Sequence, residues 1–347
     1  MRNDLLIIGR DALINKSFEY ERLFMILSDK GYDIDNVYAA EKPEDIKSIL
    51  ALSEQSNILA IGDTDALFMA LDGCTHDNSQ YFKHKDNTFI LMPQYDEKYI
   101  KDIIIPVLNS KNKIFYNSVI FKVFGKNEIQ LRELLKDFIK NKNKITFSFY
   151  PQILECEVHI RYSSAVPSVT VNEVIGKVGE LLHCSLYATS DISLSEQVSK
   201  QIVRKNKKIS IMETFTAGGI TKTLISNINN HLVESIVLSS ESSMINRAGI
   251  LHNDIVNFGI MSDEVAYNMA GSLFNNKDCD IAITVLGDNL ESAEDYDKVF
   301  YVAVGDRDVI HVFAEHYFGN ITEIREAGVK YALHCLYKFL GEEKNTQ

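Results

Sequence analysis

The sequence lacks the cysteine patterns that mark disulfide-rich domains and structural zinc sites. Its five cysteines are scattered over 347 residues, their number is odd, and none belongs to a C-x-x-C pair. A disulfide framework and a structural zinc site are therefore not expected. We expect a cytoplasmic protein of a reducing compartment, and the sequence assigns it neither a metal nor a cofactor.

Long apolar runs are also missing. No apolar stretch is long enough to span a bilayer, and the first residues carry Asp4 and then only a short apolar run. The sequence therefore predicts neither a membrane span nor a signal peptide. Internal repeats and low-complexity linkers are absent from the pattern as well.

Positive charge is in deficit. Lysine and arginine number 36 against 48 aspartates and glutamates, which gives a formal net charge of -12. Because no overall positive field attracts phosphates, we expect no sequence-independent binding to nucleic acid or to anionic membranes. Hydrophobic residues make up 46% of the chain, enough for packed cores, and the length of 347 residues suggests two or three domains.

Three segments with different patterns follow one another along the chain. In residues 1–110, short apolar strands alternate with helices, which predicts a doubly wound parallel sheet. In residues 111–192 the expected order is strand, helix, two strands, helix and strand, as in a small KH-like α+β module. Residues 193–347 contain a third set of helices and strands, so the predicted fold class is α/β.

Lysines between Lys111 and Lys144 raise the question of RNA binding by a KH-like module. The segment lacks the G-x-x-G loop that clamps nucleotides, and it has no aromatic stacking signature. Solvated helix faces explain these lysines better, and nucleic acid is not an expected partner.

The most informative stretch is Glu213–Gly219. An apolar strand, Ile209–Met212, precedes it, and a helix with Ile220 and Leu224 on one face follows. A strand that turns through small residues into a helix leaves N–H groups unpaired at the helix start, where they can hold an anion such as a phosphate. The same pattern also fits an ordinary turn with a threonine cap, and the residues alone leave both interpretations open.

Together with three further motifs, this stretch resembles the C-terminal domain of the CinA family, the nicotinamide-nucleotide amidohydrolase module. The family's motifs A-E-S-C-T-G-G, G-A-V-S-E-E-V-A, A-D-x-x-x-A-x-T-G and G-D-R-x-x-I-R stand, with substitutions, at Met212–Gly218, Gly259–Ala266, Cys279–Val285 and Gly319–Arg325. Four partial motifs in the correct order are more specific than one. At lower strength, residues 1–110 resemble a shortened form of the family's molybdopterin-binding-like first domain, and residues 111–192 resemble its middle domain.

The resemblance implies hydrolysis of nicotinamide mononucleotide to nicotinic acid mononucleotide and ammonia. Thr214, at the position of the family's catalytic serine, and Glu213 would be the catalytic residues. The nucleotide would be held by the turn and by neighbouring elements, through Thr216, Ala217, Gly218, Thr284, Arg325 and Arg247. The resemblance also implies a homodimer and a protein partner in competence or DNA-damage responses.

Several family residues are replaced in this chain. Thr214 carries a methyl group that crowds the path of nucleophilic attack. The tyrosine, asparagine and lysine of the family's A-Y-S-N-x-x-K segment fall on Ser239, Glu241 and Met244, and the first arginine of G-D-R falls on Ile321. The alternative function is therefore a catalytically inactive CinA-like scaffold or nucleotide-binding protein.

Individual residues have structural alternatives too. Thr214 is either a nucleophile or the N-cap of the following helix, and Arg325 either clamps a ligand or forms a surface ion pair. Arg247 replaces the lost lysine only if its loop is shifted. Asp11 and Asp63, at strand ends of the first segment, have the chemistry to hold a metal-bound phosphate ester. The glycine frame around them is lost, so no metal is assigned.

Overall fold

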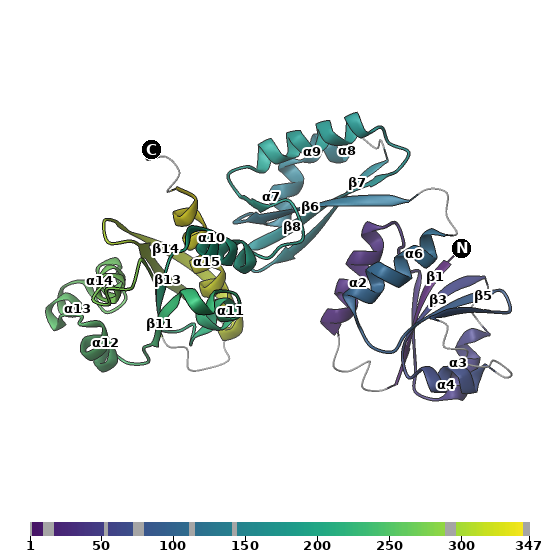
Figure 1. Cartoon of the computed structure of the whole chain (residues 1–347), viewed down its shortest axis with the longest axis horizontal. Coiled ribbons are helices and arrows are strands. Elements are labelled where there is room, and N and C mark those ends of the chain that lie inside the picture. Colours follow the sequence, from purple (N-terminus) through teal and green to yellow (C-terminus); the bar gives the residue numbers. More distant parts are fainter. Residues whose placement is uncertain are drawn as a thin grey trace. The chain divides into compact units, whose positions relative to one another are not determined.

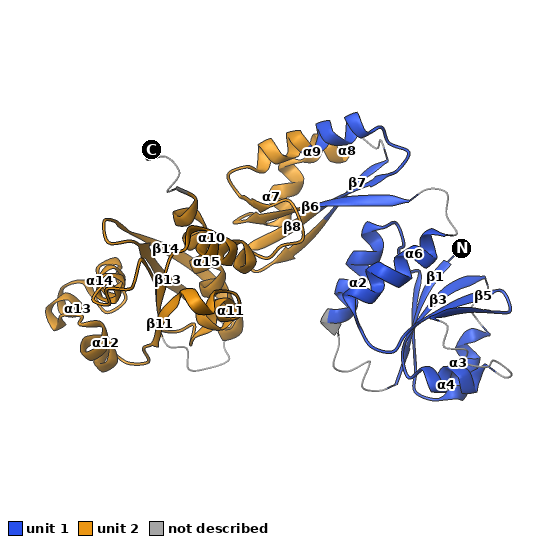
Figure 2. Ribbon diagram, in the orientation of Figure 1, with its two compact units in different colours: residues 1–119, 140–148, 159–175 blue, residues 120–139, 149–158, 176–347 orange. Residues whose placement is uncertain are grey.

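The computed structural model describes residues 2–9, 17–51, 55–71, 80–110, 115–140, 144–288 and 296–342 (Figure 1). Three β-sheets with helices packed on them confirm the predicted α/β class. The chain divides into two compact units (Figure 2), of which the first comprises residues 1–119, 140–148 and 159–175 and the second residues 120–139, 149–158 and 176–347. The domain boundaries expected after residues 110 and 192 stay predictions.

The first unit contains a five-stranded sheet in the order β2-β1-β3-β5-β4. Its parallel strands, as predicted, are β1 (Arg2–Ile8), β2 (Asn36–Ala40), β3 (Ser56–Gly62) and β5 (Asn87–Met92). The antiparallel edge strand β4 (Tyr81–His84) was not predicted. Its side chains are exposed or half-buried, so no apolar run marks it.

Helices cover both faces of this sheet. Successive side chains of its buried strands point to opposite faces, so apolar side chains lie on both. Leu5 and Ile7 pack with one group of helices, namely α2 (Ser17–Asp29), the π-helical turn η1 (Ile100–Ile104) and α6 (Ile105–Asn109). Leu6 and Ile8 pack with the other group, α3 (Pro43–Leu50) and α4 (Thr64–Ala70). The alternation explains why these strands are apolar throughout.

Asp63, one of the two acidic residues considered for a metal-bound ligand, caps a helix. Its side chain accepts hydrogen bonds from the amides of Asp65 and Ala66, both at 3.1 Å, at the start of α4. Gly62 before it has a φ of 111°, and a Cβ there would collide with the carbonyl oxygen of Ile8. Asp11 lies outside the described residues.

The second sheet has the order β7-β8-β6-β9. Its elements follow the predicted order of strand, helix, two strands, helix and strand, except that two short helices separated at Leu135 stand in place of the first helix. They are β6 (Tyr116–Phe124), α7 (Glu128–Leu134), α8 (Lys136–Lys140), β7 (Ile145–Gln152), β8 (Glu155–Ser163), α9 (Ser168–Leu182) and β9 (Leu186–Ala188).

The third sheet lies in the second unit and has the order β11-β10-β12-β13-β14. The parallel strands are β10 (Ile209–Glu213), β11 (Leu232–Val237) and β12 (Ile281–Leu286). An antiparallel hairpin extends the sheet as β13 (Tyr296–Gly305) and β14 (Ile310–Gly319). Because β10 is flanked on both sides, its backbone is fixed along its length.

Two hydrophobic cores cover the two faces of the third sheet. One contains α10 (Leu194–Lys205), α11 (Gly219–Ile228) and the long closing helix α15 (Ile321–Glu342). The other contains α12 (Glu241–Ala248) and α14 (Asp263–Leu273), with α13 (His252–Phe258) beside α14. Ser262 caps α14, since its hydroxyl accepts from the amide of Val265 at 3.3 Å. Among the described residues, no helix has the length and apolar character that crossing a bilayer requires.

Candidate functional site

The predicted site is the turn between β10 and α11. β10 pairs in parallel with β11 and β12, so the carboxyl ends of three strands meet here, where ligands bind in open α/β sheets. Ala217 and Gly218 have φ values of 53° and 86°. These left-handed conformations let the chain turn from the strand into the helix within a few residues.

Glu213 lies at the centre of this turn, and its side chain is fully buried. Oε2 accepts from the Thr216 hydroxyl at 2.8 Å and from the Ile220 amide at 3.1 Å. Oε1 accepts from the amide and the hydroxyl of Thr221, both at 3.1 Å. The carboxylate thus satisfies two N–H groups at the start of α11 and places a negative charge at the positive end of the helix.

This arrangement corrects the interpretation of the turn from sequence. N–H groups at the start of the helix were expected to be available to a ligand, but those of Ile220 and Thr221 both donate to Glu213. The predicted cradle residue Thr216 is 4% exposed and also donates to this carboxylate. The protein itself therefore supplies the anion at the beginning of the helix.

Thr214 is held by the end of β12. Its side chain is 3% exposed, and its Oγ1 lies 2.9 Å from the carbonyl oxygen of Gly287 and 3.2 Å from that of Val285. The same oxygen accepts from the Gly287 amide at 2.9 Å. The hydroxyl therefore joins two strand ends. The N-cap of α11 is Gly218, so Thr214 is not that cap.

Arg325 is the predicted ligand clamp that the structure brings to the turn. From α15, its Nε donates to the carbonyl oxygen of Phe215 at 3.0 Å. The Phe215 ring fills the space beside two glycines, Gly287 and Gly328, where a Cβ would overlap it. Arg325 thus fixes the backbone of the turn through this hydrogen bond, and the Phe215 ring occupies the space next to the two glycines.

The two remaining candidates lie away from the turn. Thr284 pairs with Met212 in the register of the sheet and is fully buried. It lies on the face of the sheet that α14 covers, where its hydroxyl donates to the carbonyl of Ala266 at 3.3 Å. Arg247 is exposed in the last turn of α12. No described hydrogen bond joins Arg247 to Thr214, so the structure does not assemble the full predicted set.

A small hollow lies beside the described part of this site. The hollow beside it measures about 10 Å³, close to the volume that one water molecule needs. Its walls include Phe215, Gly287 and Ile324, but not Glu213, Thr214 or Thr216. Residues 289–295, which follow β12, lie outside the described residues.

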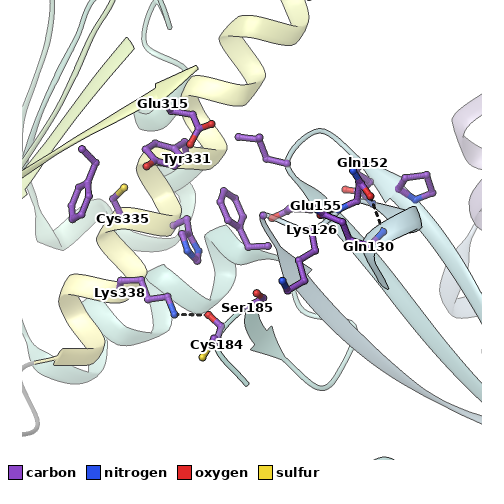
Figure 3. A pocket seen from close by; sticks show the side chains of 17 residues that line it. Lys126, Gln130, Gln152, Glu155, Cys184, Ser185, Glu315, Tyr331, Cys335 and Lys338 are labelled. Carbon is purple, nitrogen blue, oxygen red and sulfur yellow. Dashed lines mark hydrogen bonds between the residues drawn. The ribbon is translucent and has the colours of Figure 1, made fainter. Parts of the chain in front are cut away.

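A much larger cavity, of about 730 Å³, lies elsewhere in the second unit (Figure 3). One wall belongs to the second sheet and its connections, with Phe124–Asn127, Gln130, Pro151–Gln152, Leu154–Glu155 and Cys184–Ser185. The other wall belongs to β14 and α15, with Phe313, Glu315, Tyr331, His334, Cys335 and Lys338. Sequence reasoning missed this cavity, because its residues come from separate segments and form no local motif.

Comparisons with known proteins agree with the motifs. Residues 191–340 match the family model described as the CinA C-terminal domain. A putative competence-damage inducible protein of Caldicellulosiruptor saccharolyticus is 26% identical over 261 residues, which cover 72% of this chain and 62% of the relative. A protein of Clostridium botulinum with the same description is 25% identical over 268 residues, covering 74% and 66%.

Among solved structures, the competence/damage inducible protein CihA from Agrobacterium tumefaciens is 21% identical, with a TM-score of 0.38 over 45% of this chain and 100% of that one. The match to the family model, together with the ordered motifs, defines a protein with a CinA-type C-terminal domain. The family is matched over residues 191–340, and the part of the chain aligned to the curated relatives named above spans less than two thirds of their length.

Proposed function

We propose that this chain is a catalytically inactive CinA-family protein that acts by binding, as a scaffold for a protein partner or as a nucleotide-binding protein. The observation that carries the proposal is the state of Thr214. Its hydroxyl contacts the carbonyls of Val285 and Gly287 and the amide of Gly287, and its side chain is 3% exposed. The relatives are described as putative competence-damage inducible proteins, which suggests that such a partner would act in competence or in the response to DNA damage.

A hydroxyl becomes a nucleophile only when a nearby base removes its proton. The hydrogen-bond partners described for Oγ1 of Thr214 are two backbone carbonyls and one amide, and none of these is a base at neutral pH. Glu213 is the adjacent carboxylate, but its two oxygens face four other donors. The position of the family's lysine is occupied by Met244, which is buried.

Hydrolysis of nicotinamide mononucleotide is the second candidate function. It is favoured by one observation, namely that Glu213, Thr216 and Arg325 meet at a single turn, as the family motifs predict. In that reaction a water molecule would attack the amide carbon directly, its proton would pass to the nitrogen, and the C–N bond would break to release ammonia. If Thr214 attacked instead, its hydroxyl proton would pass to the nitrogen, and a water molecule would then hydrolyse the resulting ester. Attack by Thr214 requires that its bonds to Gly287 open first.

Ammonia release from nicotinamide mononucleotide separates the two candidates. We expect wild-type protein and the Thr214→Ala variant to release ammonia at the same background rate. Thr223→Ala is the matched control for folding, because Thr223 lies on α11 and its hydroxyl donates to the backbone of Gly219 at 2.7 Å. Turnover by the wild type and Thr223→Ala that disappears in Thr214→Ala would establish hydrolysis and reject the inactive form.

A further inference from the structure

We propose that the cavity of about 730 Å³ in the second unit binds a small aromatic anion, a flat ring joined to a phosphate or carboxylate group and about the size of a mononucleotide. This inference does not depend on the proposed function, since it concerns different residues. The volume falls within the range of roughly 300–1,000 Å³ that is usual for small-molecule sites.

Aromatic side chains supply the surface for a ring. Phe124 and His334 stack with their ring centroids 3.9 Å apart and an interplanar angle of 7°. Tyr331 lies beside them, its centroid 6.4 Å from that of Phe124. Phe313 on β14 also lines the cavity and is 39% exposed, although it is a large apolar residue. Phe124 is 6% exposed and already stacks on His334, so a flat ligand would lie against the exposed ring of Phe313 and remove its apolar surface from water.

Two lysines supply the positive charge. Lys126 and Lys338 extend from opposite walls toward the turn at Cys184 and Ser185 (Figure 3), and Nζ of Lys338 donates to the Cys184 carbonyl at 3.0 Å. Within the described ranges, neither lysine forms an ion pair with a carboxylate. Cations that line a cavity without acidic partners favour an anionic ligand group, and a phosphate can bridge both.

The carboxylates on the cavity wall are already engaged. Glu155 forms an ion pair with Lys330 at 3.2 Å. Burial raises the pKa of the Tyr331 phenol, and the charge of Glu315 beside it raises that pKa further. In Figure 3 Glu315 and Tyr331 lie toward one end of the cavity and Lys338 toward the other. This separation of charge orients a bound anion toward the lysines.

His334 adds a polar group within the aromatic wall. Burial and the charge of Lys338 lower its pKa to about 4, so the imidazole is neutral at physiological pH. Its Nδ1 has no hydrogen-bond partner among the residues that the structure describes. Buried polar atoms are normally satisfied, and a bound ligand or a water molecule in the cavity would satisfy this one.

The absence of tryptophan from the chain provides a clean optical test. The Phe313→Trp variant carries a single indole on the cavity wall, and its fluorescence is titrated with adenosine 5′-monophosphate, adenosine and inorganic phosphate. We expect saturable binding of the monophosphate, about tenfold tighter than that of either fragment. Calorimetry with the wild-type protein checks that the indole has not created the site.

Charge variants identify the site. In the Phe313→Trp protein, Lys126→Gln and Lys338→Gln are each expected to weaken binding of the monophosphate about tenfold, the effect of one charge-assisted hydrogen bond. Lys277→Gln removes an exposed lysine of the same unit and is expected to change nothing.

Three results would overturn the proposal. The first is no saturable signal with the monophosphate up to about 10 mM in either the fluorescence or the calorimetric titration. The second is equal affinity for adenosine and its monophosphate, which would show that the lysines hold no anion. The third is unchanged binding in both lysine variants, provided that their thermal unfolding matches that of the wild type.

Discussion

Replacing Glu213 with glutamine tests the account of the β10–α11 turn most directly. The carboxylate accepts from four donors between 2.8 and 3.1 Å and is fully buried. Glutamine keeps the shape, but its single carbonyl oxygen can accept from only one pair of these donors. Its NH2 group then faces the other pair, in which the threonine hydroxyl can rotate to accept but the backbone N–H loses its acceptor.

The cost follows from that N–H group. An unsatisfied buried polar group costs about 1–3 kcal/mol, so Glu213→Gln is expected to lower the free energy of unfolding by roughly 2 kcal/mol. That is a sizeable part of the 5–15 kcal/mol of a typical domain. Urea denaturation followed by circular dichroism measures the loss. Hydrogen exchange is expected to become faster at one of the two amides, Ile220 or Thr221, whichever faces the new NH2 group.

Glu180→Gln is the matched control, because Glu180 is exposed on α9 in the same unit. Its effect is expected to stay within about 0.5 kcal/mol. If Glu213→Gln is no more destabilising than this control, and if the exchange of the two amides does not change, the carboxylate does not hold the start of α11. The turn would then be open to an external anion, as the sequence had suggested.

Three further predictions concern the same unit. Gly328→Ala is expected to lower the free energy of unfolding by about 1–3 kcal/mol in thermal unfolding, because its Cβ would lie 2.5 Å from the Phe215 ring. The control, Gly176→Ala, meets no atom within 4 Å and should raise it by about 0.5–1 kcal/mol. Equal effects would show that Phe215 does not pack closely against Gly328. Thr214→Ala is expected to lower the free energy of unfolding by about 1–2 kcal/mol in urea denaturation, because backbone groups at the end of β12 lose their hydrogen-bond partner. An unchanged free energy would show that the hydroxyl of Thr214 does not stabilise the end of β12. In the folded state the pKa of His334 is lowered to about 4 from 6.5. Below pH 6.5 the unfolded chain therefore binds the proton more readily than the folded one, and the free energy of unfolding falls by about 2 kcal/mol between pH 7.5 and 5. His334→Gln should remove this slope in denaturation curves, and an unchanged slope would assign it to other groups.

Much of the third sheet could be predicted because its strands carry local signals. Ile209–Met212 is a continuous apolar run, and Ser262 stands before two acidic residues at the start of a helix, so both elements were located from the pattern. Helix α13 was missed because none of its side chains is buried, which leaves no apolar periodicity to detect. Edge strand β4 was missed for a related reason.

The chemistry of the turn was less predictable than its position. Glu213 stands where a carboxylate can either contact a ligand or accept from its own backbone, and these alternatives share one sequence pattern. The choice depends on whether its side chain points inward, toward Ile220 and Thr221, and only three-dimensional structure gives that direction. The hydroxyl of Thr214 presents the same difficulty, because its partners are backbone atoms of Gly287, distant in sequence.

Helix α15 takes part in both places described above. Near its beginning, Arg325 and Gly328 contact the Phe215 segment, and further along, His334 and Lys338 line the cavity. Arg325 and Lys338 lie about 20 Å apart along the axis, at 1.5 Å per residue. A helix is stiff over such a length, so a tilt at its beginning also displaces its later turns. The β10–α11 turn and the cavity are therefore mechanically coupled through α15.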